Sequence, residues 1–427
     1  MRVLMLSWEY PPVLVGGLGR HVHALAEAMA RSGHRVTVLT RHAAQDGAGA
    51  DRVPYDQVAG GVRVVRVPED PVLLRFEDEL LAWTMALNHG LTRAGLALAE
   101  AEPPDVVHAH DWLVAHAATT LKHHLRAPLV ATLHATEAGR HQGWLPEPLN
   151  RAIHSVEWWL TYEARRVLTC SSSMRWEVTR LFELPAEKVD VVPNGVDPDR
   201  WRASPEQVAA ARRRWAGDGP LVVCSGRLVY EKGVHDLLAA LPRLRRRHPG
   251  VRLVVAGRGP KEVELRELAR RLRLGRSVAF AGFVPDADLA ALVAAADCAV
   301  VPSVYEPFGM VALEATAAGT PVAVSDVGGL REIVEHRGTG LRFPAGDPAG
   351  LTDAVSELLT DQVLARRLVR QARAVLQQDH SWARIAERTG EVYQRAGREE
   401  RVLRAGLASR RVPRLVMRDG NLLAGSP

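Results

Sequence analysis

Short apolar runs alternate along the chain with longer stretches that favour helix. Apolar runs without polar alternation are typical of parallel strands that are covered on both faces. Strands that alternate with helices predict an α/β fold with two doubly wound domains. The expected strands form one group in each half of the chain: Arg2–Ser7, Arg35–Thr40, Val62–Val67, Asp105–His108, Leu129–Leu133, Arg166–Thr169 and Val189–Val192, then Leu221–Ser225, Arg252–Ala256, Val278–Ala281, Cys298–Val301 and Val322–Ser325.

Turn and breaker residues at Asn194–Pro198 mark the midpoint, where we place the linker between domains. We therefore expect a first, Rossmann-like domain over residues 1–195 and a second over residues 196–377. Residues 396–427 carry seven arginines and are expected to form a flexible or loosely docked basic tail. Ligands of doubly wound sheets bind beyond the C-terminal strand ends, so the predicted site lies in the cleft between the domains.

Composition adds bounds on size, partners and compartment. The 427 residues suit two domains of about 200 residues each. A net charge of +6 is compatible with nucleic acid, acidic lipid or a phosphate-bearing substrate. Cys170, Cys224 and Cys298 lie in or beside apolar runs without metal-ligand spacing, which predicts buried thiols in a reducing cytoplasm. No apolar run reaches the roughly 18 residues of a membrane helix, so we expect a cytoplasmic protein.

Two carboxylates, Glu306 and Glu314, flank the start of a predicted helix. If both lay on the helix they would share a face, because their spacing is a little over two helical turns. The backbone N–H groups of Phe308, Gly309 and Met310 fall at the helix N-terminus, which suits an anionic or hydroxyl-rich ligand. A carboxylate there can accept two sugar hydroxyls. Spacing alone equally allows a helix cap at Glu306 and a solvated helix residue at Glu314.

Two other segments have the composition of phosphate-binding loops. Gly16 and Gly17 follow the first predicted strand, and glycine lets backbone N–H groups approach a phosphate closely. A plain tight turn is the alternative there. Arg227 and Lys232 follow the first strand of the second half and can both reach one diphosphate, Arg as a fork and Lys as a point charge. The alternative for them is a solvated charge pair.

Histidines follow two neighbouring strands of the first half. His108 and His110 would point to the same face of a strand, but no third ligand is apparent, so we expect no metal. His134 ends the next strand and is either a satisfied polar residue or projects into the cleft. Trp144 follows in a polar loop, where it either stacks on a sugar or packs against the loop. Four more histidines are expected at the surface or on helices: His21, His23, His123 and His124.

The segment from Glu306 to Glu314 resembles the donor-sugar motif of the retaining glycosyltransferases of family 4, which have the GT-B fold. The resemblance implies that Glu306 approaches the sugar hydroxyls and that Glu314 binds the nucleotide ribose. It also implies that Arg227 and Lys232 clamp the donor diphosphate, and that a helix over residues 378–395 crosses back onto the first domain. Further donor-binding residues implied by the resemblance are Gly16, Gly17, Phe308, Gly309, Met310 and Val311.

Three first-half segments resemble actinobacterial glycogen-synthase-type α-1,4-glucosyltransferases, which act on glycogen or methylglucose lipopolysaccharide: Ser7–Pro12, His108–Trp112 and His134–Arg140. This resemblance implies transfer of glucose from UDP- or ADP-glucose to the non-reducing end of an α-1,4-glucan, with retention and without a metal or other cofactor. Arg20 departs from the pattern, because other glycogen synthases carry an aspartate there. The implied catalytic residues are Asp111, His134, Arg227, Lys232 and Glu306, and the implied acceptor-side residues are Asp111, Glu137 and Trp144.

Two other activities stay open. One is a GDP-mannose-dependent mannosyltransferase acting on a lipid or glycan acceptor. The other is a sugar-nucleotide 2-epimerase, against which the acceptor-type motifs of the first half argue. The predicted helix that carries Trp158 and Trp159 is expected to pack on the sheet, with a peripheral membrane contact as the alternative. No nucleic-acid partner is expected, and the sequence leaves the nucleotide, the acceptor length and the oligomeric state open.

Overall fold

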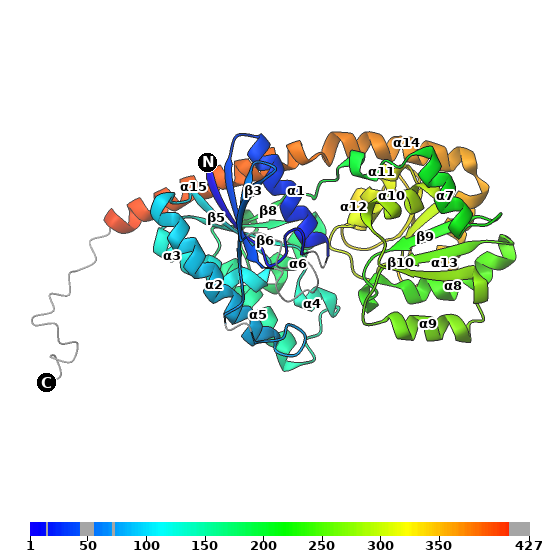
Figure 1. The fold of residues 1–427 in the computed structure, drawn as a ribbon, viewed down its shortest axis with the longest axis horizontal. Helices are drawn as coiled ribbons and strands as arrows, with labels where there is room; N and C mark the ends of the chain where they lie inside the picture. Colours follow the sequence, from blue (N-terminus) through cyan, green and yellow to red (C-terminus); the bar gives the residue numbers. More distant parts are fainter. Residues whose placement is uncertain (14–15, 43–54, 71–72, 410–427) are drawn as a thin grey trace, which may run out of the picture.

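The computed structural model describes residues 1–13, 16–42, 55–70 and 73–409. Two α/β domains lie next to each other, each built on one sheet with helices on both faces, and two long C-terminal helices run along both domains (Figure 1). The two doubly wound domains and the C-terminal helix expected from the sequence are confirmed. The exact domain boundaries stay predictions.

The first sheet has eight strands among the described residues, in the order β3-β4-β2-β1-β5-β6-β7-β8. Neighbouring strands are parallel except β3 and β4, which are antiparallel. The edge strand β3 escaped prediction because its residues form no apolar run and three of the four are exposed. The strands are β1 (Arg2–Leu6), β2 (Arg35–Arg41), β3 (Asp56–Ala59), β4 (Val62–Val67), β5 (Val106–His110), β6 (Leu129–Leu133), β7 (Arg166–Thr169) and β8 (Val189–Val191).

The second sheet is parallel throughout, in the order β11-β10-β9-β12-β13-β14. Its edge strand β14 also escaped prediction, because it has only three residues and an arginine in the middle. The strands are β9 (Leu221–Ser225), β10 (Arg252–Ala256), β11 (Val278–Gly282), β12 (Cys298–Val301), β13 (Val322–Ser325) and β14 (Leu341–Phe343).

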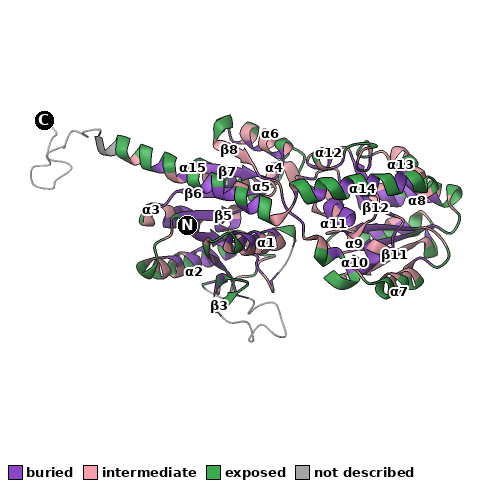
Figure 2. Cartoon of the chain, turned by 90° about the horizontal axis from the view of Figure 1, so that it is seen from above, coloured by how far each residue is buried: buried purple, intermediate pink, exposed green. Residues whose placement is uncertain are grey.

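The helices bury one face against the sheets and expose the other, while most strands are buried (Figure 2). In the first domain they are α1 (Gly17–Arg31), α2 (Leu80–Ala101), α3 (Ala115–Leu125), α4 (Glu137–Arg140), α5 (Pro148–Glu163) and α6 (Ser172–Leu181). In the remainder they are α7 (Pro205–Trp215), α8 (Val234–Arg247), α9 (Glu262–Arg271), α10 (Asp286–Ala295), α11 (Met310–Ala318), α12 (Leu330–Ile333), α13 (Pro348–Thr360), α14 (Gln362–Asp379) and α15 (Trp382–Ser409). Within the described residues, none of these helices has the length and apolar character of a membrane span.

Strand order reverses once in each sheet, beside the first strand of each domain. In the first sheet β1 lies between β2 and β5, and in the second sheet β9 lies between β10 and β12. The loops that leave the C-terminal ends of two such strands diverge and leave a crevice, which is where doubly wound sheets bind ligands. The loops after β1, β5, β9 and β12 carry most of the predicted site residues, so the topology places them at these two crevices.

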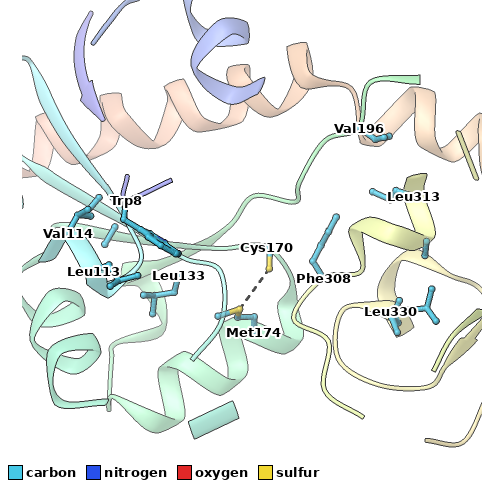
Figure 3. Close-up of a cluster of buried hydrophobic side chains, with 14 of the residues drawn as sticks. Trp8, Leu113, Val114, Leu133, Cys170, Met174, Val196, Phe308, Leu313 and Leu330 are labelled. Carbon is cyan, nitrogen blue, oxygen red and sulfur yellow. Dashed lines mark hydrogen bonds between the residues drawn. The ribbon is translucent and has the colours of Figure 1, made fainter. Parts of the chain in front are cut away.

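Apolar packing continues from one domain into the other. One cluster of buried residues includes Trp8 and Cys170 of the first domain together with Phe308 and Leu313 of the second. Figure 3 shows Cys170 beside Phe308, and Cys170 Sγ lies 3.5 Å from the carbonyl oxygen of Pro307. All three cysteines are buried free thiols, which confirms that part of the sequence-based prediction.

The last helix, α15, packs against α1 and reaches the core of the first domain. Tyr393 is completely buried, and its hydroxyl lies 2.7 Å from His108 Nδ1. The helix continues to Ser409 and Glu400 pairs with Arg165 at 2.9 Å. The prediction of a flexible or loosely docked tail from residue 396 is therefore wrong for the start of that segment, which continues α15 and buries Ala396 and Glu400. The rest of the predicted tail lies outside the described residues.

Candidate active site

The loops after β9 and β12 bring a lysine and a carboxylate together. Lys232 Nζ lies 2.7 Å from Glu306 Oε2, and Ser303 Oγ donates to the same oxygen at 3.0 Å. Gly233 follows with a φ of +63°, and a Cβ there would collide with the carbonyl oxygen of Pro302. Glycine therefore allows the lysine-bearing loop to approach the loop that carries the carboxylate.

Arg227 lines the same cavity as Lys232 and Glu306. Its pKa is lowered, first by burial and then by the charge of Arg140. Because Arg140 ends α4 of the first domain, a cation of the other domain acts electrostatically on Arg227. Such a set of cations attracts a multiply charged phosphate group. Arg140 was not predicted as a site residue, since one arginine in a polar loop has no distinguishing pattern.

Glu314 lies on α11, whereas Glu306 lies on the loop before it, so the two carboxylates do not share a helix face. Gly309 precedes the helix with a φ of 113°, which favours glycine, and a Cβ there would collide with Leu330. Burial raises the pKa of Glu314 to about 7, although the charge of Arg20 opposes the rise. The expected solvated-helix alternative for Glu314 is wrong, because the residue is only 8% exposed.

Arg20 reaches from α1 of the first domain to the second domain. Its Nη2 atom lies 2.8 Å from Asp286 Oδ1, at the start of α10, and its Nη1 atom lies 3.7 Å from Glu314 Oε1. The arginine that departs from the glycogen-synthase pattern therefore connects the two domains beside a predicted donor-binding carboxylate.

The glycine turn before α1 is held by a buried carboxylate. Gly16 N donates to Glu9 Oε2 at 3.0 Å, and Glu9 is only 3% exposed. A Cβ added at Gly16 or Gly17 would meet no heavy atom within 4 Å, so the space in front of both glycines is open. An open backbone of this kind can approach a ligand closely. Positions 14 and 15 of the turn lie outside the described residues.

Asp111 follows β5 in a strained conformation, with a φ of 62°. Its Oδ1 atom accepts a hydrogen bond from His134 N at 2.7 Å, which joins the ends of two neighbouring strands. Burial raises the pKa of Asp111 to about 6 and lowers the pKa of His134 to about 4. Strain in a non-glycine residue at a strand end is common at functional sites. Asp111 and His134, which were predicted separately, therefore form one unit.

Two further histidines lie beside His134 of this unit. His110 Nδ1 lies 3.2 Å from His134 Nε2, and the His21 ring lies 4.7 Å from the His134 ring between centroids. His21 was expected at the surface or on a helix; it lies on α1 but is buried, with its ring beside the rings of His134 and Trp382. His110, without His108, has two further possible metal ligands beside it, His21 and His134, which the sequence did not suggest. His123 and His124 are exposed, as predicted.

Tyr305 carries a second bridge between the domains. Its hydroxyl donates to Glu177 Oε1 on α6 at 2.9 Å and lies 3.4 Å from Thr136 N. Thr136 Oγ1 donates to the same carboxylate oxygen at 2.5 Å. A Cβ on Gly139 would collide with the Tyr305 hydroxyl. Sequence reasoning missed Tyr305 and Glu177, because their contact joins positions 128 residues apart.

The other two predicted acceptor-side residues, Glu137 and Trp144, differ from each other in their surroundings. Glu137 Oε1 accepts from Asn150 Nδ2 at 2.6 Å and lies 3.3 Å from His141 Nε2, so its carboxylate already has partners within the first domain. Trp144 is 77% exposed. Trp159 packs partly against the core, as expected for its helix, whereas Trp158 is 45% exposed.

Comparisons with known proteins match this architecture. The model of "Glycosyltransferase Family 4" matches residues 15–200, and the model of "Glycosyl transferases group 1" matches residues 207–375. A glycogen synthase from Mycobacterium tuberculosis is 48% identical over 407 residues, which cover 94% of this chain and 96% of that protein. The chain belongs to the family 4 glycosyltransferases. This confirms the family resemblance of the donor motif.

Solved structures place this family 4 glycosyltransferase in the GT-B fold. A sucrose-phosphate synthase from Thermosynechococcus elongatus aligns with a TM-score of 0.76 and 26% identity, covering 95% of this chain and 99% of that one. The catalytic domain of starch synthase IV from Arabidopsis thaliana aligns with a TM-score of 0.75 and 21% identity, covering 93% and 99%. The predicted GT-B fold is therefore confirmed, with the cavity of Arg227 and Lys232 in its second domain.

Proposed function

We propose that this family 4 glycosyltransferase moves glucose from UDP- or ADP-glucose to the non-reducing end of an α-1,4-glucan, with retention of configuration. The observation that carries the proposal is the convergence of Arg227, Lys232 and Glu306 on one cavity. Two cations beside a carboxylate fit a diphosphate joined to a sugar, because the cations pair with phosphate oxygens and the carboxylate accepts sugar hydroxyls. The glycogen synthase relative supports glucose as the sugar and a glucan as the acceptor.

Each residue then has a role in the transfer. Arg227 and Lys232 bind the diphosphate and stabilise the negative charge that grows as the bond from glucose C1 to the phosphate oxygen breaks. Glu306 accepts sugar hydroxyls, and Glu314 accepts those of the nucleotide ribose. His134 contacts the transferred sugar from the first domain, beside Asp111. The backbone N–H groups at the start of α11 face the donor.

Retention follows in this scheme from the face of attack. The acceptor O4 attacks C1 from the side on which the diphosphate leaves, and an oxygen of the departing phosphate takes the O4 proton. One C–O bond breaks and one forms, so no enzymic nucleophile is needed. The two cations balance the charge of the leaving group, and we expect transfer to continue in the presence of a chelator.

Analysis of the product tests this proposal. The protein is incubated with maltopentaose and a glucose donor, and the new linkage is assigned by NMR and by digestion with an enzyme specific for α-1,4 bonds. We expect an α-anomeric signal at the time of transfer and complete digestion of the added units. A β-linked product would overturn retention, and an undigested α-linked product would overturn the α-1,4 assignment.

A further inference from the structure

The histidines of the first domain form a buried cluster at the ends of β5 and β6. His21, His110 and His134 each offer one ring nitrogen, and the three nitrogens lie within 4.8 Å of one another. His110 is completely buried and His21 is 5% exposed. The three side chains come from α1, β5 and the end of β6, so their convergence is a property of the tertiary fold.

A neighbouring buried histidine has hydrogen-bond partners for both of its ring nitrogens. His108 lies on the same strand, and its two nitrogens have Tyr393 Oη and Thr132 Oγ1 at 2.7 Å each. By contrast, His21 Nδ1 is buried and has no hydrogen-bond partner among the described residues. The His110 nitrogen that faces the cluster is Nδ1, which has only His134 Nε2 beside it, at 3.2 Å. An unpaired buried nitrogen costs about 1–3 kcal/mol, so native structures seldom keep one without a reason.

The geometry fits a small cation with nitrogen ligands. Tetrahedral Zn²⁺ holds its ligands at about 2.0–2.1 Å, which places two ligand nitrogens about 3.3 Å apart. His110 Nδ1 and His134 Nε2 lie 3.2 Å apart. Rotation of the His21 ring, whose terminal torsion is soft, can close the longer separation. Three imidazoles with one open position resemble the ligand set of a zinc ion that keeps a water or a substrate group.

We propose that His21, His110 and His134 bind one zinc-class cation, and that the bound ion inhibits the transferase. Binding of the cation follows from the histidine cluster alone. Inhibition by the bound ion rests on the proposed function, in which His134 contacts the transferred sugar. A cation held by His134 Nε2 engages the side chain that contacts the sugar in the proposed function, so donor sugar and cation compete for His134.

Metal binding is tested on full-length protein without a histidine tag, stripped with a chelator and dialysed against Zn²⁺ alone. We expect one site per chain, with Co²⁺ in the same site giving the visible absorption of a tetrahedral nitrogen complex. His21→Gln and His110→Gln should each weaken Zn²⁺ binding by about 100-fold or more, since changes even outside the ligand shell cost 10–100-fold. His124→Gln, on the exposed face of α3, is the matched control and should bind as the wild type does.

Metal binding and inhibition can be tested separately. Absence of Zn²⁺ binding by the wild type, or equal binding by wild type and His21→Gln, overturns the site. Should His110→Gln fail to fold, His21→Gln decides alone, because His21 is 5% exposed whereas His110 is completely buried. Stoichiometric Zn²⁺ should suppress glucose transfer in the wild type, and a chelator should restore it. Undiminished transfer by the zinc-loaded protein overturns inhibition, whereas metal binding without transfer from any donor leaves the site standing and rejects the proposed function.

Discussion

Lys232 Nζ lies 2.7 Å from Glu306 Oε2, in a cavity that Arg227 also lines. The lysine predicted to hold the diphosphate and the carboxylate predicted to hold the sugar are therefore already paired across two loops. In the proposed function the donor spans both groups, with its phosphate at the cation and its sugar at the carboxylate. The pair thus fixes where the bond between sugar and phosphate must lie.

Removing either member should abolish most transfer. Lys232→Met and Glu306→Gln should each lower kcat/KM by about 100-fold or more, because groups that stabilise transition-state charge are worth that much. Lys261→Met is the control, since Lys261 pairs with Glu264 on an exposed face of the same domain. Thermal unfolding confirms that each variant is folded. Near-normal turnover in both site variants would contradict the assignment.

Donor use should depend on the ionisation of Glu314, whose pKa is raised to about 7. The kcat/KM for the donor should rise with pH through this value, because the carboxylate form accepts the ribose hydroxyls and this parameter reports the free enzyme. Arg20→Ala should move the midpoint to higher pH and Asp286→Asn to lower pH, since Arg20 lowers and Asp286 raises that pKa. A profile that keeps its midpoint in Glu314→Gln would contradict this.

The Glu314 carboxyl group should also make the free energy of unfolding fall with pH, whereas kcat/KM for the donor rises. The folded protein keeps the Glu314 proton up to a pH of about 7, whereas the unfolded chain releases it near the ordinary glutamate pKa of 4.5. Between these values the folded state binds more protons, so the free energy of unfolding falls as the pH rises. We expect Glu314→Gln to remove part of this fall in denaturant titrations at pH 5 and pH 8. Parallel curves for both proteins would refute the prediction.

The Tyr305 bridge should hold the domains together. Gly139→Ala places a Cβ against the Tyr305 hydroxyl, and Tyr305→Phe removes the hydrogen bond to Glu177. Both changes should raise the radius of gyration in small-angle scattering and weaken transfer, because the two halves of the site separate. Tyr162→Phe, at an exposed tyrosine of α5, should change neither. An unchanged radius in both variants would show that other contacts set the domain arrangement.

The features that the sequence predicts well are local. Buried parallel strands such as β9 and β12 are continuous apolar runs, and Arg227 and Lys232, the predicted diphosphate clamp, lie within one loop. Each can be recognised within a window of a few residues. The two domains follow from the alternation of such windows, because strand and helix periods differ.

The features that escaped prediction depend on contacts between distant positions. His21 on α1 lies beside His134, which follows β6, and Arg140 of the first domain acts electrostatically on Arg227 of the second. The edge strand β3 and the far part of α15 are polar segments that depend on a neighbouring element for their structure. No local pattern distinguishes such residues from ordinary surface positions.

The central claim is glucose transfer to a glucan, and a donor screen tests it most directly. Purified protein is incubated with maltooligosaccharides and UDP-glucose, ADP-glucose or GDP-mannose, beside Lys232→Met as the inactive control, and the products are sized by mass spectrometry. We predict stepwise addition of single glucose units from one or both glucose donors. Absence of chain growth with either glucose donor, together with transfer from GDP-mannose to a membrane extract, would contradict the account and assign the protein to lipid glycosylation.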